Sequence, residues 1–353
     1  MQSGTGGAFG FFPQTAVATE PTVDEYYWME GNLVQPGPQQ LVRNVGQTVG
    51  GSFLPARSLK TAAWSGGRLV LPPVMVGYLG WFFHAFAGSY SGVDNTDGTF
   101  TFTFPDSGLD NDPPAARYLA FHKIIPVDGG GNFAETMLDQ IPHTITLGCV
   151  PGELATCQMD FLGRSFSSED DASGTGWTPG DYEDIGILPL ITKGHFELPD
   201  GSAADNATGV TIELRNLIPD LRRVLVAGSY YPLGFPVMGR ALTVSWTALW
   251  KNATLYKACY YNASGAWNPS VYSTDLDILM ESPLDAYGTG LDLPMSLKFF
   301  GGQVEWEAEP ISLQGGDLIE MRMTGTLTNT ASGTDWYLAL TNEQAVDYYD
   351  WPT

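Results

Sequence analysis

The stretches GELATCQMD at residues 152–160 and GDLIEMRMT at residues 316–324 lie 164 positions apart (316 minus 152) and follow one pattern. Each begins with glycine, an acidic residue and leucine, and each has methionine at its eighth position. Polar and apolar side chains then alternate with a period of two residues, which predicts a β-strand with one buried face. The polar side chains of the two predicted strands are Thr156, Gln158 and Asp160, and Glu320, Arg322 and Thr324.

A weaker similarity precedes each of these strands. FLPARSL at residues 53–59 and FPVMGRAL at residues 235–242 carry Arg57 and Arg240, which lie 183 positions apart (240 minus 57). Two amphipathic strands can look alike by coincidence, and the alternative is a duplicated β-domain. Duplication predicts an N-terminal arm at residues 1–20, two β-domains at residues 21–200 and 201–340, an acidic loop at residues 167–180, and a C-terminal arm at residues 341–353.

Other alternating stretches favour a mainly β fold. TFTFTF at residues 99–104 directs every phenylalanine to one face, and similar alternation occurs at residues 210–215, 242–250 and 303–307. The sequence also contains 42 glycines and 24 prolines, and 12 % of its residues are aromatic. Frequent turns between strands that carry aromatic side chains fit this composition better than a helical protein does.

One apolar stretch predicts a helix. No Asp, Glu, Lys or Arg occurs from Leu69 to Val93, a length that could suggest a membrane span. Prolines and glycines interrupt this stretch, and its apolar part at residues 74–87 is too short to cross a bilayer. Because this part follows a proline pair and is apolar on all sides, we expect a helix buried in a core or an interface.

The charge balance excludes several classes of function. The 353 residues include 39 Asp and Glu against 16 Lys and Arg, which gives a formal net charge of −23. A protein that grips nucleic acid neutralises phosphates with Lys and Arg, so this chain is not a general DNA or RNA clamp. Binding to an anionic membrane is excluded for the same reason, and the N-terminus has no pattern of a signal peptide. The acidity is also compatible with simple solubility.

No motif for catalysis or for a cofactor occurs in the sequence. The four histidines and three cysteines are scattered without the spacing of a metal site or a nucleophilic triad. Asp106, Asp110 and Asp112 could hold a calcium ion or form a solvated turn. Glu305-Trp306-Glu307 is typical of a sugar-binding face and equally of an ordinary β-core. We therefore expect no enzyme, no cofactor and no metal site.

A series of segments in the first half resembles a known family. A strand with Gly, Pro and Arg (GGSFLPAR, residues 50–57) precedes a strand interrupted by glycines (AWSGG, residues 63–67). A short apolar helix follows, which opens with GYLG at residues 77–80 and ends at Ala87–Gly88. In this order the segments resemble the major tail tube proteins of long-tailed bacteriophages. The segments at residues 121–123, 145–160 and 228–230 fit the same order.

The resemblance implies a fold and an assembly. Tail tube subunits join their sheets edge to edge into a ring-shaped channel lined by β-strands, and the rings stack. The family's common members have one barrel per subunit, so the internal similarity suggests two tandem tail-tube-type barrels with a short packed helix. A ring would then contain three copies rather than six.

The resemblance also implies a function in the virion. Double-stranded DNA passes through the channel at ejection without specific binding, and a lining of carboxylates and hydroxyls would repel its phosphates. The expected partners are further copies of the chain, the tape-measure protein and the proteins at the tail end, without a membrane. We expect the protein to be made in the host cytoplasm and located in the phage tail.

Two sets of residues are expected to serve the assembly. Residues predicted to line the channel lie on the polar sides of the expected strands: Thr156, Gln158, Asp160, Glu305, Glu307, Glu320 and Thr324. Arg322 would be the exception among them, paired with a neighbouring acid. Residues predicted to contact the next ring lie in the terminal arms: Phe9, Phe11, Phe12, Tyr348, Tyr349 and Trp351.

Two other functions are compatible with the residues. Another β-rich virion protein, such as a capsid decoration or baseplate component, would show the same composition. A carbohydrate-binding or glycan-cleaving β-sandwich would also present aromatic side chains beside acidic ones.

Overall fold

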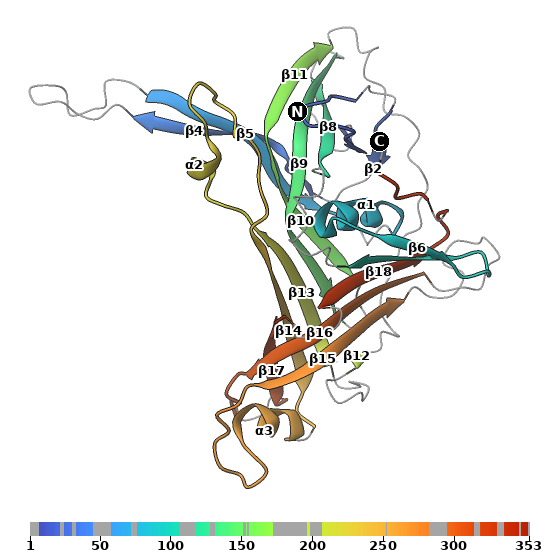
Figure 1. Ribbon diagram of the computed structural model, residues 1–353, viewed down its shortest axis with the longest axis vertical. Coiled ribbons are helices and arrows are strands. Elements are labelled where there is room, and N and C mark those ends of the chain that lie inside the picture. The colour runs from blue at the N-terminus through green and yellow to red at the C-terminus, as the bar shows by residue number, and fades with distance from the viewer. Residues whose placement is uncertain are drawn as a thin grey trace, which may run out of the picture.

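The structure of the protein is a computed structural model that describes residues 7–21, 25–29, 33–44, 58–71, 76–105, 117–127, 131–150, 153, 155–171, 196–197, 207–251, 253–281, 295–313, 318–329, 335–345 and 347–351 (Figure 1). The strands in the first half of the chain are β1 (Ala8–Pro13), β2 (Tyr27–Met29), β3 (Leu33–Val34), β4 (Gly37–Asn44), β5 (Ser58–Val70), β6 (Ser91–Asp94), β7 (Phe100–Pro105), β8 (Leu119–Val127), β9 (Gly131–Cys149), β10 (Thr156–Gly163) and β11 (Ser165–Asp171). The remaining strands are β12 (Phe196–Glu197), β13 (Ala207–Leu217), β14 (Gly239–Leu249), β15 (Tyr272–Glu281), β16 (Ser296–Ala308), β17 (Glu320–Leu327) and β18 (Trp336–Asn342). The helices are α1 (Val76–Ala87), α2 (Leu221–Val224) and α3 (Thr254–Tyr260).

Backbone hydrogen bonds connect the strands into one extended sheet, so the predicted mainly β fold is confirmed. Within it, a unit of four strands occurs twice in the same spatial order. The first unit is β4–β5–β10–β9 and the second is β13–β14–β17–β16. The two similar sequence stretches form the third strand of each unit, beginning at Thr156 and Glu320. The sequence similarity therefore marks equivalent positions in a repeated structure.

The two units share one sheet and one core. Residues 144–149 of β9 pair with residues 210–215 of β13, which joins the units edge to edge. We call the resulting sheet, β4–β5–β10–β9–β13–β14–β17–β16–β15, the main sheet. Buried side chains from both units, such as Met159 and Met323, belong to the same hydrophobic cluster. The two β-domains expected from the sequence are therefore not packed as separate bodies, and their expected boundary at residue 200 lies outside the described residues.

The longest strands of each half also leave the main sheet. Residues 131–140 of β9 pair with β8 and β11, and β8 continues to β1 and β2. Residues 296–301 of β16 pair with β18, which continues to β7 and β6. These two side sheets and the main sheet enclose helix α1 (Figure 1). Only one face of the main sheet is covered in this way.

Helix α1 lies at the centre of the core, as predicted for the short apolar segment at residues 74–87. Its side chains are buried on all sides, including Trp81, Phe82 and Phe83. Gly80 provides the space for a ring from another part of the chain, because a Cβ atom at this position would lie 2.3 Å from the ring of Tyr349. The hydroxyl of Tyr349 donates to the Gly77 carbonyl at 2.7 Å and accepts from the Asn342 amide at 3.0 Å.

The described parts of the two expected terminal arms pack within the chain. Residues 8–13 form β1, which pairs with β8 and β2 inside a side sheet. At the other end, residues 341–342 belong to β18, and residues 347–351 pack on α1 through Tyr349. Aromatic side chains that look like free contacts in the sequence are needed to fill the core around the helix. Likewise, residues 167–171 of the expected acidic loop belong to strand β11, which pairs with β9; residues 172–180 lie outside the described residues.

A buried histidine in the core, His84, makes the stability of the fold depend on pH. His84 is buried, and its Nδ1 lies 2.9 Å from the carbonyl oxygen of Tyr349. Burial lowers the pKa of His84 to about 3, the Arg117 guanidinium adds to the lowering, and the hydrogen bond to Tyr349 opposes it. In the unfolded chain the pKa returns to about 6.5, so below that pH the unfolded state binds a proton that the folded state excludes. Acid therefore destabilises the fold.

We expect the free energy of unfolding to fall by about 2 kcal/mol through His84 alone between pH 6.5 and pH 5. The variant His84→Asn keeps an N–H donor near Tyr349 but does not titrate, so its pH dependence in this range should be shallower. Some dependence should remain, because burial also lowers the pKa of His122, to about 4. Urea unfolding at several pH values, followed by tryptophan fluorescence, measures this slope. An unchanged slope in the variant would contradict this account of His84.

Candidate functional site

The uncovered face of the main sheet is polar across eight strands, and we call it the polar face. Side chains from successive strands align in rows. One row contains Gln158, Thr146, Glu213, Thr243, Thr326, Glu305 and Ser273. A second row contains Thr156, Thr211, Ser245, Thr324 and Glu307, with Gly148 between the first two. Further members of the face are Arg68, Thr144, Asp160, Arg215, Thr247, Glu320 and Arg322.

The face results from strict alternation along each strand. In β13, Thr211 and Glu213 are exposed, whereas Val210, Ile212 and Leu214 between them are buried in the core. In β17, Glu320 and Thr324 are exposed, whereas Met321 and Met323 are buried. A period of two residues sends neighbours to opposite sides of a sheet. The same strands therefore provide a core on one side and a hydrophilic surface on the other.

All seven residues predicted to line a channel lie on this one face. Thr156, Gln158 and Asp160 come from β10, Glu305 and Glu307 from β16, and Glu320 and Thr324 from β17. The residues of β9, β13 and β14 that complete the rows were not among the residues predicted to line the channel. Their signal was present in the alternation around residues 210–215 and 242–250, which shows that a strand has two faces but not which strands lie together.

Carboxylates outnumber cations on the polar face. Its acids are Asp160, Glu213, Glu305, Glu307 and Glu320, and its bases are Arg68, Arg215 and Arg322. Two of the arginines are close to acids of the same face. Arg68 donates to Asp160 through Nε at 2.9 Å, and Arg322 lies 3.6 Å from Glu320, as its expected pairing with a neighbouring acid suggests. Both pairs are solvent-accessible, so they neutralise charge locally and contribute little to stability.

Histidine adds no positive charge to this face at neutral pH. His143 lies in β9 beside Thr144, with 3.4 Å between its Nδ1 and the threonine hydroxyl oxygen. Burial lowers the pKa of His143, and the Arg215 guanidinium lowers it further, whereas Asp160 acts in the opposite direction. The imidazole therefore remains neutral at pH 7.

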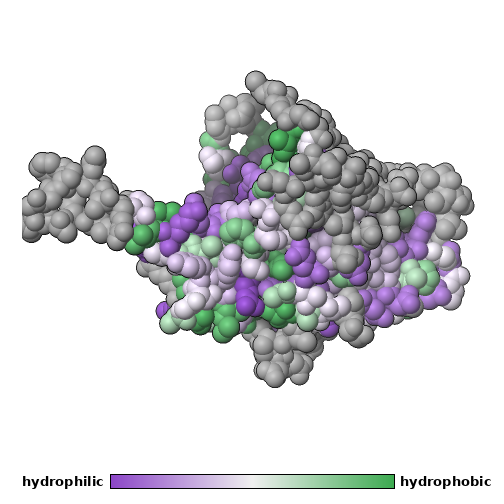
Figure 2. All heavy atoms as spheres, turned by 90° about the horizontal axis from the view of Figure 1, so that it is seen from above, coloured by the Kyte–Doolittle hydropathy of each residue, from purple (hydrophilic) through white to green (hydrophobic). Residues whose placement is uncertain are grey.

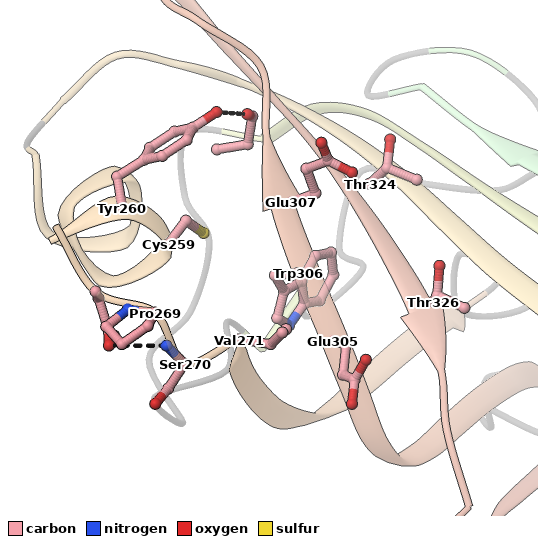
Figure 3. Close-up of a pocket in the computed structure, with 12 residues that line it drawn as sticks. Cys259, Tyr260, Pro269, Ser270, Val271, Glu305, Trp306, Glu307, Thr324 and Thr326 are labelled. Carbon is pink, nitrogen blue, oxygen red and sulfur yellow. Dashed lines mark hydrogen bonds between the residues drawn. The ribbon is translucent and has the colours of Figure 1, made fainter.

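A pocket of about 370 Å³ opens at the edge of the polar face, beneath α3 (Figure 3). Glu305 and Glu307 of β16 and Thr324 and Thr326 of β17 form one wall. The segment that follows α3 forms the other wall with Pro269, Ser270 and Val271. The hydroxyl of Tyr260 donates to the Ala308 carbonyl and holds α3 against β16.

The pocket does not present the groups of a catalytic site. Burial raises the pKa of the Cys259 thiol to about 11, against a smaller lowering by the Ala308 backbone, so the thiol is protonated and a poor nucleophile. Trp306 is buried, and its Nε1 donates to the Thr274 hydroxyl at 2.9 Å. In Glu305-Trp306-Glu307, the tryptophan thus packs in the core, whereas the two carboxylates lie on the polar face and line the pocket.

The residues predicted to contact a neighbouring ring need a correction. Phe9, Phe11 and Tyr349 are buried in the core of their own chain and offer no surface to another molecule in this structure. Phe12, Tyr348 and Trp351 are half-buried and are also engaged within the chain. Phe12 stacks on Tyr27, Tyr348 packs on Trp81, and Nε1 of Trp351 donates to the Gln14 carbonyl at 2.8 Å.

The described part of the chain contains no group of three or more His, Cys, Asp or Glu side chains that could hold a metal ion. Asp106, Asp110 and Asp112, which could hold calcium or form a turn, lie outside the described residues. Among the helices that are described, none is both long enough and apolar enough to span a membrane.

Comparison with known protein families identifies the chain. The family described as phage tail tube protein matches residues 4–308. The chain belongs to the phage tail tube protein family. Tail tube proteins are structural proteins of the phage tail that assemble with copies of themselves into a tube and associate with other tail proteins. The resemblance noted in the first half of the sequence is therefore confirmed, and the matched region also includes the strands of the polar face up to β16. A comparison with curated protein sequences finds no match.

In this tail tube protein, substitutions on the polar face should change the free energy of unfolding much less than substitutions in the core beneath it. Replacing Glu213, Glu305 and Glu307 together by glutamine should change the free energy of unfolding by less than about 1 kcal/mol, because exposed charges contribute little to folding. The matched control is Ile212→Ala, one position away on the other face, which should cost about 2–5 kcal/mol because Ile212 is fully buried. Urea unfolding of the two variants provides the comparison. A large loss in the triple variant would mean that the polar face is a structural rather than a functional surface.

Proposed function

We propose that three copies of this tail tube protein close into a ring whose polar faces line a central channel. Stacked rings form the tube, and double-stranded DNA passes through it at ejection without specific binding. The tape-measure protein inside the tube and the proteins at the tail end are its further partners, and assembly takes place in the host cytoplasm. The observation that carries this proposal is the polar face, which continues from the first four-stranded unit to the second across the β9–β13 joint.

The repeated unit supports a ring of three. Each chain contains two units, and the bond between β9 and β13 joins the last strand of one to the first strand of the next. Six such units closed on one another require three chains. In a closed ring of this kind, the strand edges that an open sheet would expose are paired with strands of the neighbouring chain.

Open edges at both ends of the main sheet support closure between chains. At one end, β4 pairs with β5 along one side, and the described residues provide no strand for its other side. At the opposite end, Ser273 and Thr274 of β15 pair with β16 along one side, and no described strand pairs with these two residues on the other side. Unpaired backbone groups of this kind are templates for another strand, and a second copy of the chain provides it.

The composition of the polar face supports a channel for DNA. Hydroxyls dominate it, its carboxylates outnumber its arginines, and Arg68 and Arg322 each lie beside an acid. Phosphates bind where Lys and Arg side chains can replace their counterions. A surface on which two of three arginines are locally neutralised and carboxylates are in excess offers few such places, so a polyanion can slide along it with little friction.

Electron microscopy of the purified protein tests the assembly. We expect tubes or stacked rings with threefold symmetry and a central channel wide enough for a DNA duplex. Sixfold rings with one chain per unit would contradict the ring of three. A protein that stays monomeric and binds glycans would instead favour the carbohydrate-binding alternative.

The passage of DNA is tested by reversing one charge on the polar face. Virions that carry Glu213→Lys should assemble tails of normal length but release DNA several-fold more slowly at low salt, because each added lysine attracts phosphate. Added salt should restore the rate, since it screens this attraction. The matched control is Glu20→Lys, an exposed position away from the polar face. A dye that binds released DNA measures the rate, and equal rates for both variants would contradict a channel lined by this face.

A further inference from the structure

Two exposed apolar patches lie at opposite ends of the strands of the main sheet. The α2 patch comprises Val226, Tyr230, Leu233 and Met238, in the segment between β13 and β14. The α3 patch comprises Tyr261, Trp267 and Val271, in the segment between α3 and β15. Between 44 % and 71 % of each of these side chains is exposed. Strand β14 begins next to the α2 patch and ends next to α3, so its 11 residues separate the patches by roughly 35 Å (Figure 1).

Both patches are parts of ordered structure. In the α2 patch, Leu225 and Pro232 form a β-bridge, and the Leu233 amide donates to the Val224 carbonyl at 2.9 Å. The same segment is attached to the neighbouring unit, because the Ala63 amide of β5 donates to the Tyr230 carbonyl at 2.8 Å. In the α3 patch, Tyr261 and Trp267 face each other in a β-bridge. Large apolar side chains held on the surface in this way mark a site of contact.

The two patches differ in shape and in surroundings. The α3 patch adjoins the pocket beneath α3, whose described lining includes Val271 with Glu305 and Glu307 and contains no Lys, Arg or His. The α2 patch is a loop with exposed Arg223 next to Val224. Exposed Arg43 and Lys60 belong to the β4–β5 pair, which extends to one side of the molecule (Figure 1; Figure 2 shows it from above) and contacts the α2 segment through Ala63. An exposed apolar loop therefore lies at one end of the strands. At the other end, exposed apolar side chains lie beside a pocket walled by Glu305 and Glu307, and exposed Lys257 lies one helical turn before Tyr261.

We infer that the α2 patch of one copy docks on the α3 patch of a copy in the next ring, and that this contact stacks the rings. The inference rests on the proposed function, and it assigns the stacking surface to these patches rather than to the terminal aromatic residues, which pack within their own chain. A contact between two different patches is heterologous, so it leaves one free patch at each end and repeats along an axis. A contact of one patch with itself would close after two copies. The two patches lie at opposite ends of the strands, and one is a loop whereas the other adjoins a pocket, so a contact between different patches fits their positions and shapes.

Complementation between two variants tests this contact. The α2-patch variant Tyr230→Ser/Leu233→Ser and the α3-patch variant Trp267→Ser/Val271→Ser each keep one patch intact. Alone, each should form single rings and lose the ability to form tubes. Mixed together, they should form pairs of rings that grow no further, because one intact α2 patch meets one intact α3 patch. Electron microscopy and analytical ultracentrifugation distinguish rings, ring pairs and tubes.

The control is Val93→Ser, which removes an equally exposed apolar side chain on β6 and should leave tubes unchanged. Because all substituted side chains are exposed, the variants should unfold at the same urea concentration as the wild type. The single substitution Leu233→Lys repeats the test of the α2 patch and should likewise give rings without tubes. Tubes of normal length from either patch variant would overturn the inference while leaving the tube function intact. Ring pairs from the α3-patch variant alone would also overturn it, since they require contact between two α2 patches. Short head-to-tail oligomers of the wild type, lost in both patch variants, would support the contact and contradict the proposed tube.

Discussion

The backbone hydrogen bonds between β9 and β13 determine the form of this protein. They join two four-stranded units edge to edge, so that the chain builds one wide sheet instead of two closed domains. The apolar faces of both units then point to the same side, where α1 and the side sheets cover them. The opposite face remains in solvent, and alternation along each strand makes it hydrophilic. The pairing register between β9 and β13 thus places the apolar sides of both units in one core and their polar sides on one surface.

Much of the fold could be predicted from local patterns. Alternation located the strands that contain Thr156 and Glu320, and the spacing of 164 residues identified them as equivalent. The same alternation gave the polar side of each strand, which is why the predicted channel residues share one face. The full face could not be predicted, because the pairing of β9 with β13 joins residues more than 60 positions apart. Such long-range pairing leaves no periodic signal in the sequence.

The termini show where sequence reasoning was misleading. Terminal aromatic residues resemble free contact sites when only composition and position are considered. Tyr349 instead fills the space above Gly80, and its hydroxyl bonds to Gly77 and Asn342. A glycine in a helix and a tyrosine 269 positions later (349 minus 80) can be related only through their distance in space. Exposed residues such as Tyr230 and Trp267, which the sequence did not predict as contact residues, lie on the surface instead.

The position of Tyr349 against α1 also affects the order of events during synthesis. The helix cannot be fully enclosed until β18 and the residues up to Tyr349 have left the ribosome, because these late segments complete its surroundings. A nascent chain therefore carries its open strand edges before its core is closed. Non-local closure of this kind is slow and leaves incomplete chains loosely packed. Growth of the polymer onto chains still attached to ribosomes is disfavoured as a result, since only a completed molecule presents rigid edges in the correct register.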